Sequence, residues 1–136
     1  MNGVESGCLA KIIQYFSDEP LVSAVYLFGS MAKGTAGRDS DIDLGILFGE
    51  GLAKEERFDL RLKIAGDLEE ICGRLIDVVD LEEATLFFQY QVRKTGCLIV
   101  EKDHKHRVEF VVRSRREYFD LHYILERRNN ALIAKF

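Results

Sequence analysis

The sequence has little proline and cysteine, and no apolar run in it approaches the length of a membrane-spanning helix. Pro20 is the single proline among 136 residues, and 47% of the residues are hydrophobic, a composition that is wrong for a disordered chain. Cys8, Cys72 and Cys97 are odd in number and far apart, so they imply no disulfide framework and fit buried thiols in a reducing cytosol. The N-terminus lacks a basic start followed by a long apolar stretch. We therefore expect a cytoplasmic protein.

The chain also lacks an excess of positive charge. Its 19 Lys and Arg residues against 23 Asp and Glu residues give a formal net charge of -4, which argues against a protein that holds nucleic acid mainly by neutralising phosphates. Residues 93–116 are a local exception. The basic residues there are Arg93, Lys94, Lys102, Lys105, Arg107, Arg113, Arg115 and Arg116. They would either face an anionic ligand or partner, or form a solvated helix face.

The length and the order of the expected elements indicate one domain over residues 1–136. The fold class is α/β (α+β), a small mixed β-sheet with helices packed on it. Strands are expected at 21–28, 41–48, 75–81 and 97–102. Helices are expected at 8–16, 53–75, 82–96 and about 105–134, with one short helical turn at 31–34.

Helical spacing predicts which side chains face the core. The helix at 53–75 carries one apolar stripe, made of Phe58, Leu62, Ala65, Leu68 and Ile71. In the next helix, Phe87, Phe88 and Tyr90 are expected to be core aromatic residues rather than a platform for base stacking.

The C-terminal segment raises three expectations. His104 and His106 are expected in a loop before the helix. The helix could break at Ser114, where Ser114 and Glu117 would form a capping box. Its tail is too apolar for a simple surface helix, so it would pack on the domain or on a partner. The apolar tail residues are Tyr118, Phe119, Leu121, Tyr123, Ile124 and Leu125.

The chemically informative stretch is "LFGSMAKGTAGRDSDIDLGIL", residues 27–47. Asp41 and Asp43 are two apart in an expected strand, so both side chains point to one face, where they repel each other unless a cation lies between them. Mg²⁺ takes oxygen ligands and is commonly shared with substrate phosphates, so the pair predicts a magnesium site. Gly29 and Ser30 end the preceding strand and would hold a phosphate with backbone N–H groups and a hydroxyl.

Further candidate residues lie near this pair. Lys33 and Arg38 add positive charge close to the predicted phosphate site. A third carboxylate is expected from the strand at 75–81, where Asp77 lies between apolar residues and needs a compensating partner. Asp80 is the competitor, but it points to the opposite face, so the pattern favours Asp77.

These residues resemble the motif of the nucleotidyltransferase superfamily typified by DNA polymerase β and kanamycin nucleotidyltransferase. That motif is Gly-Ser, a spacer, Asp-any-Asp and a later third Asp on a neighbouring strand. Gly29, Ser30, Asp41 and Asp43 match it, and Lys33 stands where arginine is more usual. The resemblance implies a polymerase β-like nucleotidyltransferase fold. It also implies that Asp41, Asp43 and Asp77 bind metal and catalyse, and that Gly29, Ser30 and Lys33 bind the nucleotide.

The short chain is similar to the minimal nucleotidyltransferases (MNT), the antitoxin halves of toxin–antitoxin pairs whose toxin is an all-helical HEPN ribonuclease. "LIDVVDL" (75–81) resembles their third-carboxylate strand and "RREYFDL" (115–121) their final helix. For this subfamily the resemblance implies ATP as substrate, two Mg²⁺ ions, and transfer of AMP to a tyrosine of the HEPN toxin. From the charge and the lack of a long apolar run, we expect no direct nucleic-acid substrate and no membrane, and a homo-oligomer stays open.

Two alternative functions stay open. The chain could be a non-catalytic antitoxin that neutralises its partner by contact through the apolar tail. It could also be a small-molecule nucleotidyltransferase of the aminoglycoside type, although such enzymes usually carry an extra helical domain to hold the acceptor. The aspartates favour an enzyme, because contact alone would not require such costly residues.

Overall fold

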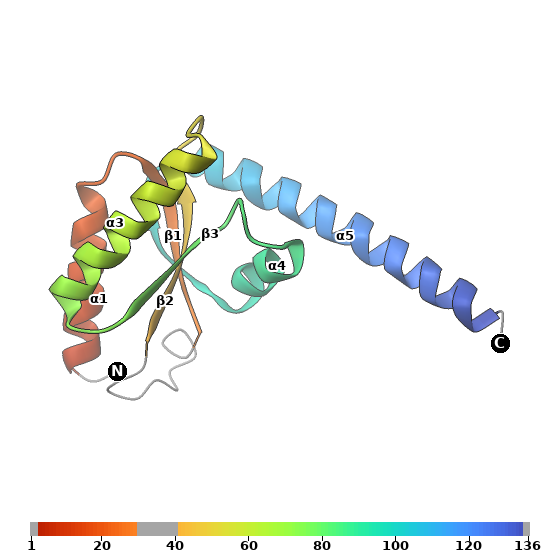
Figure 1. The fold of residues 1–136 in the computed structure, drawn as a ribbon, viewed down its shortest axis with the longest axis horizontal. Helices are drawn as coiled ribbons and strands as arrows, with labels where there is room; N and C mark the ends of the chain where they lie inside the picture. Colours follow the sequence, from red (N-terminus) through yellow and green to blue (C-terminus); the bar gives the residue numbers. More distant parts are fainter. Residues whose placement is uncertain (1–2, 30–40, 135–136) are drawn as a thin grey trace.

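The computed structural model of the protein describes residues 3–29 and 41–134, which form a four-stranded sheet with helices on both faces (Figure 1). The strands are β1 (Val22–Phe28), β2 (Ile42–Phe48), β3 (Ile76–Asp80) and β4 (Cys97–Glu101). The helices are α1 (Gly3–Ser17), α3 (Lys54–Cys72), α4 (Leu86–Thr95) and α5 (His104–Ala134). The helical turn expected at 31–34 lies outside the described residues.

The sheet is mixed, as the sequence predicts. Its order is β3-β2-β1-β4, with β1 antiparallel to both β2 and β4 and with β2 parallel to β3. A parallel pair needs a long crossover between its strands, and α3 provides it here. The α/β prediction is therefore confirmed for the described residues.

Each face of the sheet has its own apolar cluster, because side chains alternate along a strand. Helices α1 and α3 cover one face, and α4 with the first part of α5 covers the other (Figure 1). The first cluster includes Ile12, Phe16, Ile42, Leu44, Ile46, Ile64 and Leu68. The second includes Ala24, Tyr26, Leu47, Leu81, Val92 and Phe110. Leu47 lies in the second cluster, so the odd-numbered residues of β2 face α4 and α5.

Helix α5 is continuous from His104 to Ala134, and its second half extends away from the sheet (Figure 1). The predicted break is wrong. Ser114 is buried, and its hydroxyl donates a hydrogen bond of 2.6 Å to Oε1 of Gln89 on α4, so it joins two helices instead of capping a new one. Tyr118, the first of the apolar tail residues, stacks on Tyr90 of α4, so the start of the tail packs on the domain. The other large apolar residues of the tail are exposed. They are Phe119, Leu121, Tyr123, Ile124 and Leu125.

The apolar stripe predicted for α3 is only partly right, because Leu68 is buried and Ala65 packs against the core, but its other members are exposed. Phe58 and Leu62 are 52% and 55% exposed, whereas the buried positions of the helix are Arg57, Ile64 and Leu68. The buried face of the helix therefore differs from the predicted one, because it includes a charged residue, Arg57. The partner of Arg57 on the sheet is Asp80.

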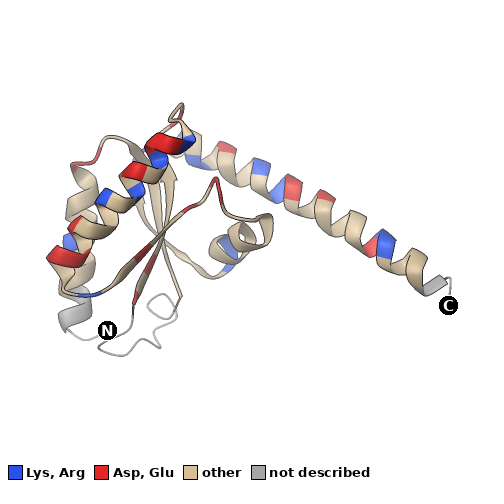
Figure 2. Ribbon diagram, in the orientation of Figure 1, with Lys and Arg blue, Asp and Glu red and all other residues tan. Residues whose placement is uncertain are grey.

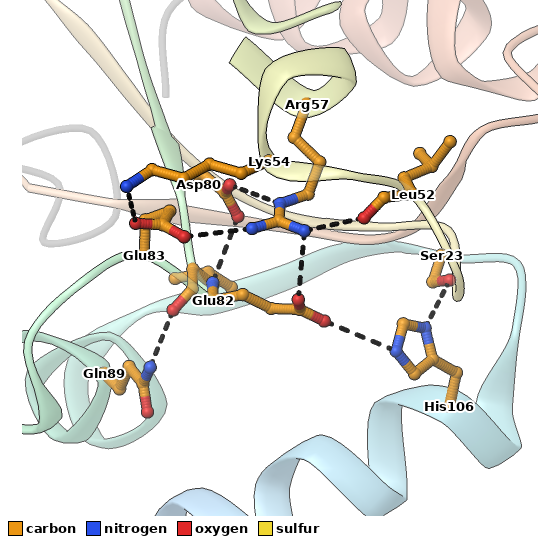
Figure 3. A network of polar contacts seen from close by, with 10 residues as sticks. Ser23, Leu52, Lys54, Arg57, Asp80, Glu82, Glu83, Gln89 and His106 are labelled. Carbon is orange, nitrogen blue, oxygen red and sulfur yellow. Dashed lines mark hydrogen bonds and ion pairs between the residues drawn. The ribbon is translucent and has the colours of Figure 1, made fainter.

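Arg57 is the centre of a polar network at the end of β3 (Figure 3). Its Nε donates to Oδ2 of Asp80 at 2.7 Å, its Nη2 donates to Oε1 of Glu83 at 3.0 Å, and its Nη1 donates to the Leu52 carbonyl at 2.8 Å. The side chains of Arg57 and Asp80 are only 11% and 8% exposed. A buried charge is tolerated only when it is paired and hydrogen-bonded, so this network holds α3 in its rotation.

The same network reaches α5 through a buried histidine (Figure 3). Nε2 of His106 lies 3.7 Å from Oε1 of Glu82, and Nδ1 of His106 shares a hydrogen bond of 2.8 Å with the hydroxyl of Ser23 on β1. Both His104 and His106 lie in the first turn of α5, so the expectation of a loop is wrong. His106 joins the start of α5 to the sheet.

Other burial expectations are only partly met. Cys8 is buried and Cys72 is half-buried, but Cys97 is exposed at the start of β4. Phe88 packs edge-on against Phe28, whereas Phe87 is exposed and is not a core residue. None of the helices in the described residues is both long and apolar enough to span a bilayer.

We predict that Arg57→Leu lowers the free energy of unfolding by roughly 3–5 kcal/mol, because Asp80 is left buried without its partner. The measurement is urea denaturation. Lys63→Leu is the matched control, because Lys63 is exposed on the same helix, and its effect should stay within about 0.5 kcal/mol. A loss below about 1 kcal/mol for Arg57→Leu would mean that the network does not hold α3.

Candidate active site

Asp43 and Asp77 lie side by side on the two parallel strands. The register of β2 and β3 pairs Asp43 with Asp77, and neighbouring strands are about 4.8 Å apart. Asp43 is half-buried and Asp77 is exposed, so both carboxylates can reach a ligand from solvent. Figure 2 shows acidic segments on these adjacent strands. The fold thus brings together two of the three predicted carboxylates by backbone pairing alone.

Asp41 immediately precedes β2 and is exposed. It lies two positions before Asp43, and its charge acts on the Asp43 carboxyl. The three aspartates of the sequence prediction therefore form one group, with Asp43 at its centre. Their catalytic and metal-binding roles stay predictions.

The pKa of Asp43 is raised above its ordinary value. Burial is the largest cause, and repulsion from Asp77 and from Asp41 adds to it. All three effects disfavour the charged carboxylate. A bound cation would reverse the two electrostatic effects, so the group is arranged to favour a positive ion between its carboxyl groups.

Asp80 lies on the same strand as Asp77 but has a different environment. Three positions along β3 it points to the opposite face, where Arg57 binds it. Its charge is therefore already compensated by a cation of the protein. Asp77, in contrast, is exposed, and its side chain is open to solvent.

Gly29 ends β1 directly beside the Asp43 carboxylate. Its φ is +75°, a conformation that residues with a side chain rarely adopt. A Cβ at this position would overlap Oδ2 of Asp43. Glycine is thus needed both for the turn and for the close approach of the backbone to the carboxylate. Ser30 and Lys33, the other predicted nucleotide-binding residues, lie outside the described residues.

The carboxylates fit a magnesium ion as a partial site. Within the described residues, no three histidine, cysteine, aspartate or glutamate side chains converge closely enough to hold a metal on their own. Mg²⁺ usually takes one or two protein carboxylates, keeps several waters, and completes its shell with substrate phosphates. The Asp43–Asp77 pair with Asp41 beside it matches that requirement. Such a site would assemble fully only with a phosphate-bearing substrate.

Sequence reasoning missed one feature on the same face of the sheet. Tyr26 and Gly96 line a cavity of about 430 Å³ together with several basic residues of α4 and α5. Tyr26 lies in an apolar strand, so no local pattern marks it as a cavity residue. The excess of basic residues over 93–116 was the available signal, but only the tertiary structure shows which of them meet.

Comparisons with known proteins agree with this geometry. The family model described as "Polymerase beta, Nucleotidyltransferase" matches residues 10–105. The chain therefore belongs to the polymerase β nucleotidyltransferase family. The matched range includes β1 to β4 and all the aspartates of the candidate site.

Among curated proteins, the chain is similar to the protein adenylyltransferase MntA of Shewanella oneidensis. The two are 37% identical over 87 residues, which are 63% of this chain and 60% of that protein. The match thus spans less than two thirds of the length of that relative.

Solved structures show the same fold. A chain of a toxin–antitoxin complex with AMP-PNP superposes with a TM-score of 0.68 at 24% identity, covering 93% of this chain and 97% of that one. A chain of the complex between the tri-AMPylated Shewanella oneidensis HEPN toxin and its MNT antitoxin gives a TM-score of 0.61 at 22% identity, covering 96% and 97%.

We predict that Gly29→Ala turns the Asp43 carboxylate away and weakens Mg²⁺ binding at least tenfold. Gly51→Ala is the matched control, because Gly51 also has a positive φ, +88°, but a Cβ there would meet nothing within 4 Å. Both variants should lose about 1–2 kcal/mol of stability from backbone strain. Only Gly29→Ala should lose metal affinity, measured by titration with Mg²⁺. Equal Mg²⁺ affinity in the two variants would contradict this role of Gly29.

We predict that Asp43→Asn stabilises the metal-free protein at neutral pH. The folded-state pKa of Asp43 lies above the unfolded value, so the folded protein holds this proton more tightly and loses stability as pH rises from about 4 through the raised pKa. Asparagine removes that loss. Thermal unfolding in EDTA at several pH values should show a Tm about 1–3 °C above the wild type at pH 7 and no gain at pH 3. Asp120→Asn, a change at an exposed position on α5, should show no such pH dependence.

Proposed function

We propose that this protein is a Mg²⁺-dependent nucleotidyltransferase that transfers AMP from ATP to a hydroxyl group of a protein, a tyrosine of a HEPN toxin, and that it acts as the antitoxin. The observation that carries the proposal is the paired register of Asp43 and Asp77 beside Gly29. This arrangement can hold a cation and a phosphate group at one end of the sheet. Family membership supports the same chemistry.

In the proposed reaction, AMP passes from ATP to the acceptor hydroxyl. The acceptor oxygen would form a bond to the α-phosphorus of ATP. The bond between that phosphorus and the oxygen that bridges it to the β-phosphorus would break, and pyrophosphate would leave. When bound, Mg²⁺ supplies positive charge to the phosphates and lowers the pKa of the attacking hydroxyl. Asp41, Asp43 and Asp77 would hold the two ions, and Asp77 on β3 would also lie next to the acceptor hydroxyl and receive its proton.

The similar proteins support the donor and the partner. The curated relative is named a protein adenylyltransferase, one structural neighbour contains AMP-PNP, and another contains an AMPylated HEPN toxin bound to an MNT antitoxin. Each of these facts belongs to those proteins. Together with the aspartate group they favour ATP as donor and a HEPN toxin as acceptor for this chain.

Contact-only inhibition is the second candidate. The observation that favours it is the outer part of α5, which presents exposed apolar residues such as Phe119, Tyr123 and Ile124. A surface of this kind could bind a partner without any transfer of AMP. The two functions differ in what they require from the aspartates.

We predict that Asp43→Asn and Asp77→Asn each lower AMP transfer by at least about 100-fold, which corresponds to about 2.7 kcal/mol of transition-state stabilisation. The assay incubates the protein with α-labelled ATP, Mg²⁺ and a co-expressed HEPN toxin, and label on the toxin is located by mass spectrometry. Circular dichroism checks that each variant is folded.

Asp120→Asn serves as the control for this assay, because Asp120 is exposed on α5 and far along the helix from the sheet. It should transfer AMP at the wild-type rate. If Asp43→Asn transferred AMP normally, the carboxylate model would be wrong. If the wild type left the toxin unlabelled but still formed a stable complex that blocked its activity, contact-only inhibition would replace transfer.

A further inference from the structure

The basic residues of 93–116 fall into two groups in the structure. Some have a structural partner. Nζ of Lys102 donates to the carbonyls of Phe16 and Glu19 at the C-terminal end of α1, and Arg107 forms an ion pair with Glu101. These side chains stabilise the fold and are explained without a ligand.

The second group meets in the cavity between β1, β4, α4 and α5. Arg93, Lys94 and Arg115 line it together with Arg107, and no aspartate or glutamate is among its lining residues. Within the described chain, Arg93, Lys94 and Arg115 form no ion pair with a carboxylate. Figure 2 shows basic segments on α4 and on the half of α5 nearest the sheet. The cavity is therefore a concentration of uncompensated positive charge.

A solvated helix face accounts for exposed basic residues, but it does not account for the position of Arg93. Its Nε and Nη2 atoms are buried, and neither has a hydrogen-bond partner in the described part of the chain. Burial and the neighbouring charge of Arg115 both lower the pKa of Arg93. Arg93 as a whole is half-buried, and buried N–H donors are normally hydrogen-bonded, so these two atoms are available to the oxygen of a water or of a ligand.

The cavity also has aromatic and apolar walls. Tyr90 stacks in parallel on Tyr118 with 4.3 Å between ring centroids, and the charged groups of Arg93 and Lys94 lie over the Tyr90 ring. The other walls are Tyr26, Leu98 and Val111. A volume of about 430 Å³ is within the range of small-molecule sites. Cations beside aromatic faces suit a ligand that has both phosphate groups and a base.

The cavity lies on the same face of the sheet as Asp43. On β1, Phe28 pairs with Asp43, and Tyr26 lies two residues before Phe28 on the same face of the sheet. Two residues along a strand and one strand across place the Cα atoms of Tyr26 and Asp43 roughly 8 Å apart. A ligand of nucleotide size could thus extend from the carboxylates into the cavity.

We propose that the cavity lined by Arg93, Lys94 and Arg115 is a second anion site, which binds the phosphate groups of a nucleotide next to the Asp43–Asp77 pair. Its identification as a nucleotide subsite rests on the proposed function. Two sources have this chemistry: the β- and γ-phosphates of the ATP donor, or the phosphate of an AMP already attached to the acceptor. One arginine guanidinium group can donate two parallel hydrogen bonds to the oxygens of one phosphate. Such a pair of bonds would satisfy the buried donors of Arg93.

The first test measures binding without catalysis. In buffer with EDTA, pyrophosphate, ATP and 5′-phosphorylated diadenylate are titrated by calorimetry into the wild type, the double variant Arg93→Gln/Arg115→Gln, and Arg116→Gln. We expect the affinity of at least one probe to fall tenfold or more in the double variant and to stay within twofold in Arg116→Gln, which removes the same charge at an exposed position outside the cavity. Lys94→Gln, also at an exposed position, should weaken the same probe and does not depend on folding of the double variant.

The second test separates the two sources in the transfer assay with Mg²⁺. If the donor phosphates occupy the cavity, the KM for ATP rises in the double variant from the first transfer onward. If the attached nucleotide occupies it, the first AMP is added at the wild-type rate and further additions are lost. Both results support the site. Equal binding by the wild type, the double variant and Lys94→Gln, or no binding of any probe to the wild type at millimolar concentration, overturns it. Binding in EDTA with no transfer by the wild type would instead reject the proposed function and keep the anion site.

Discussion

The parallel pairing of β2 with β3 is the constraint on which the rest of the site depends. It sets Asp43 against Asp77, two like charges on neighbouring strands, and each would be more stable elsewhere. Burial raises the pKa of Asp43, and repulsion from Asp77 adds to this shift. A cation between the two carboxylates would offset this cost, as the proposed function expects. Gly29 then explains how a backbone comes close enough to take part.

The opposite face of the same strand shows how the fold tolerates acidic residues where no ligand is expected. Asp80 is buried, and Arg57 of α3 compensates its charge with a direct hydrogen bond. Glu82 and His106 extend that network to Ser23 and α5. The two aspartates of β3 thus have different roles, because alternation along a strand gives them different neighbours. The network fixes α3 and α5, and the sheet between them holds the carboxylates in place.

The positions of the strands and the grouping of the aspartates could be predicted from sequence. Strand alternation and glycine positions are local signals, and Asp41 and Asp43 belong to a short motif. The predictions that failed depended on long-range partners. Arg57 is buried on the inner face of α3, where periodicity predicts an apolar residue, because it binds Asp80. Ser114 lies inside a continuous helix, and Gln89 accepts its hydrogen bond. Neither partner can be recognised from helical periodicity.

The sequence by itself determined the mixed α/β class, the short spacing of Asp41 and Asp43, and the opposite faces of Asp77 and Asp80, since each follows from local pattern along the chain. The tertiary structure alone decided the register that pairs Asp43 with Asp77. It also decided which of the basic residues stabilise the fold and which meet in one cavity. The physical reason is that strand pairing and helix packing join residues distant in sequence, and electrostatic energy depends on those distances in space.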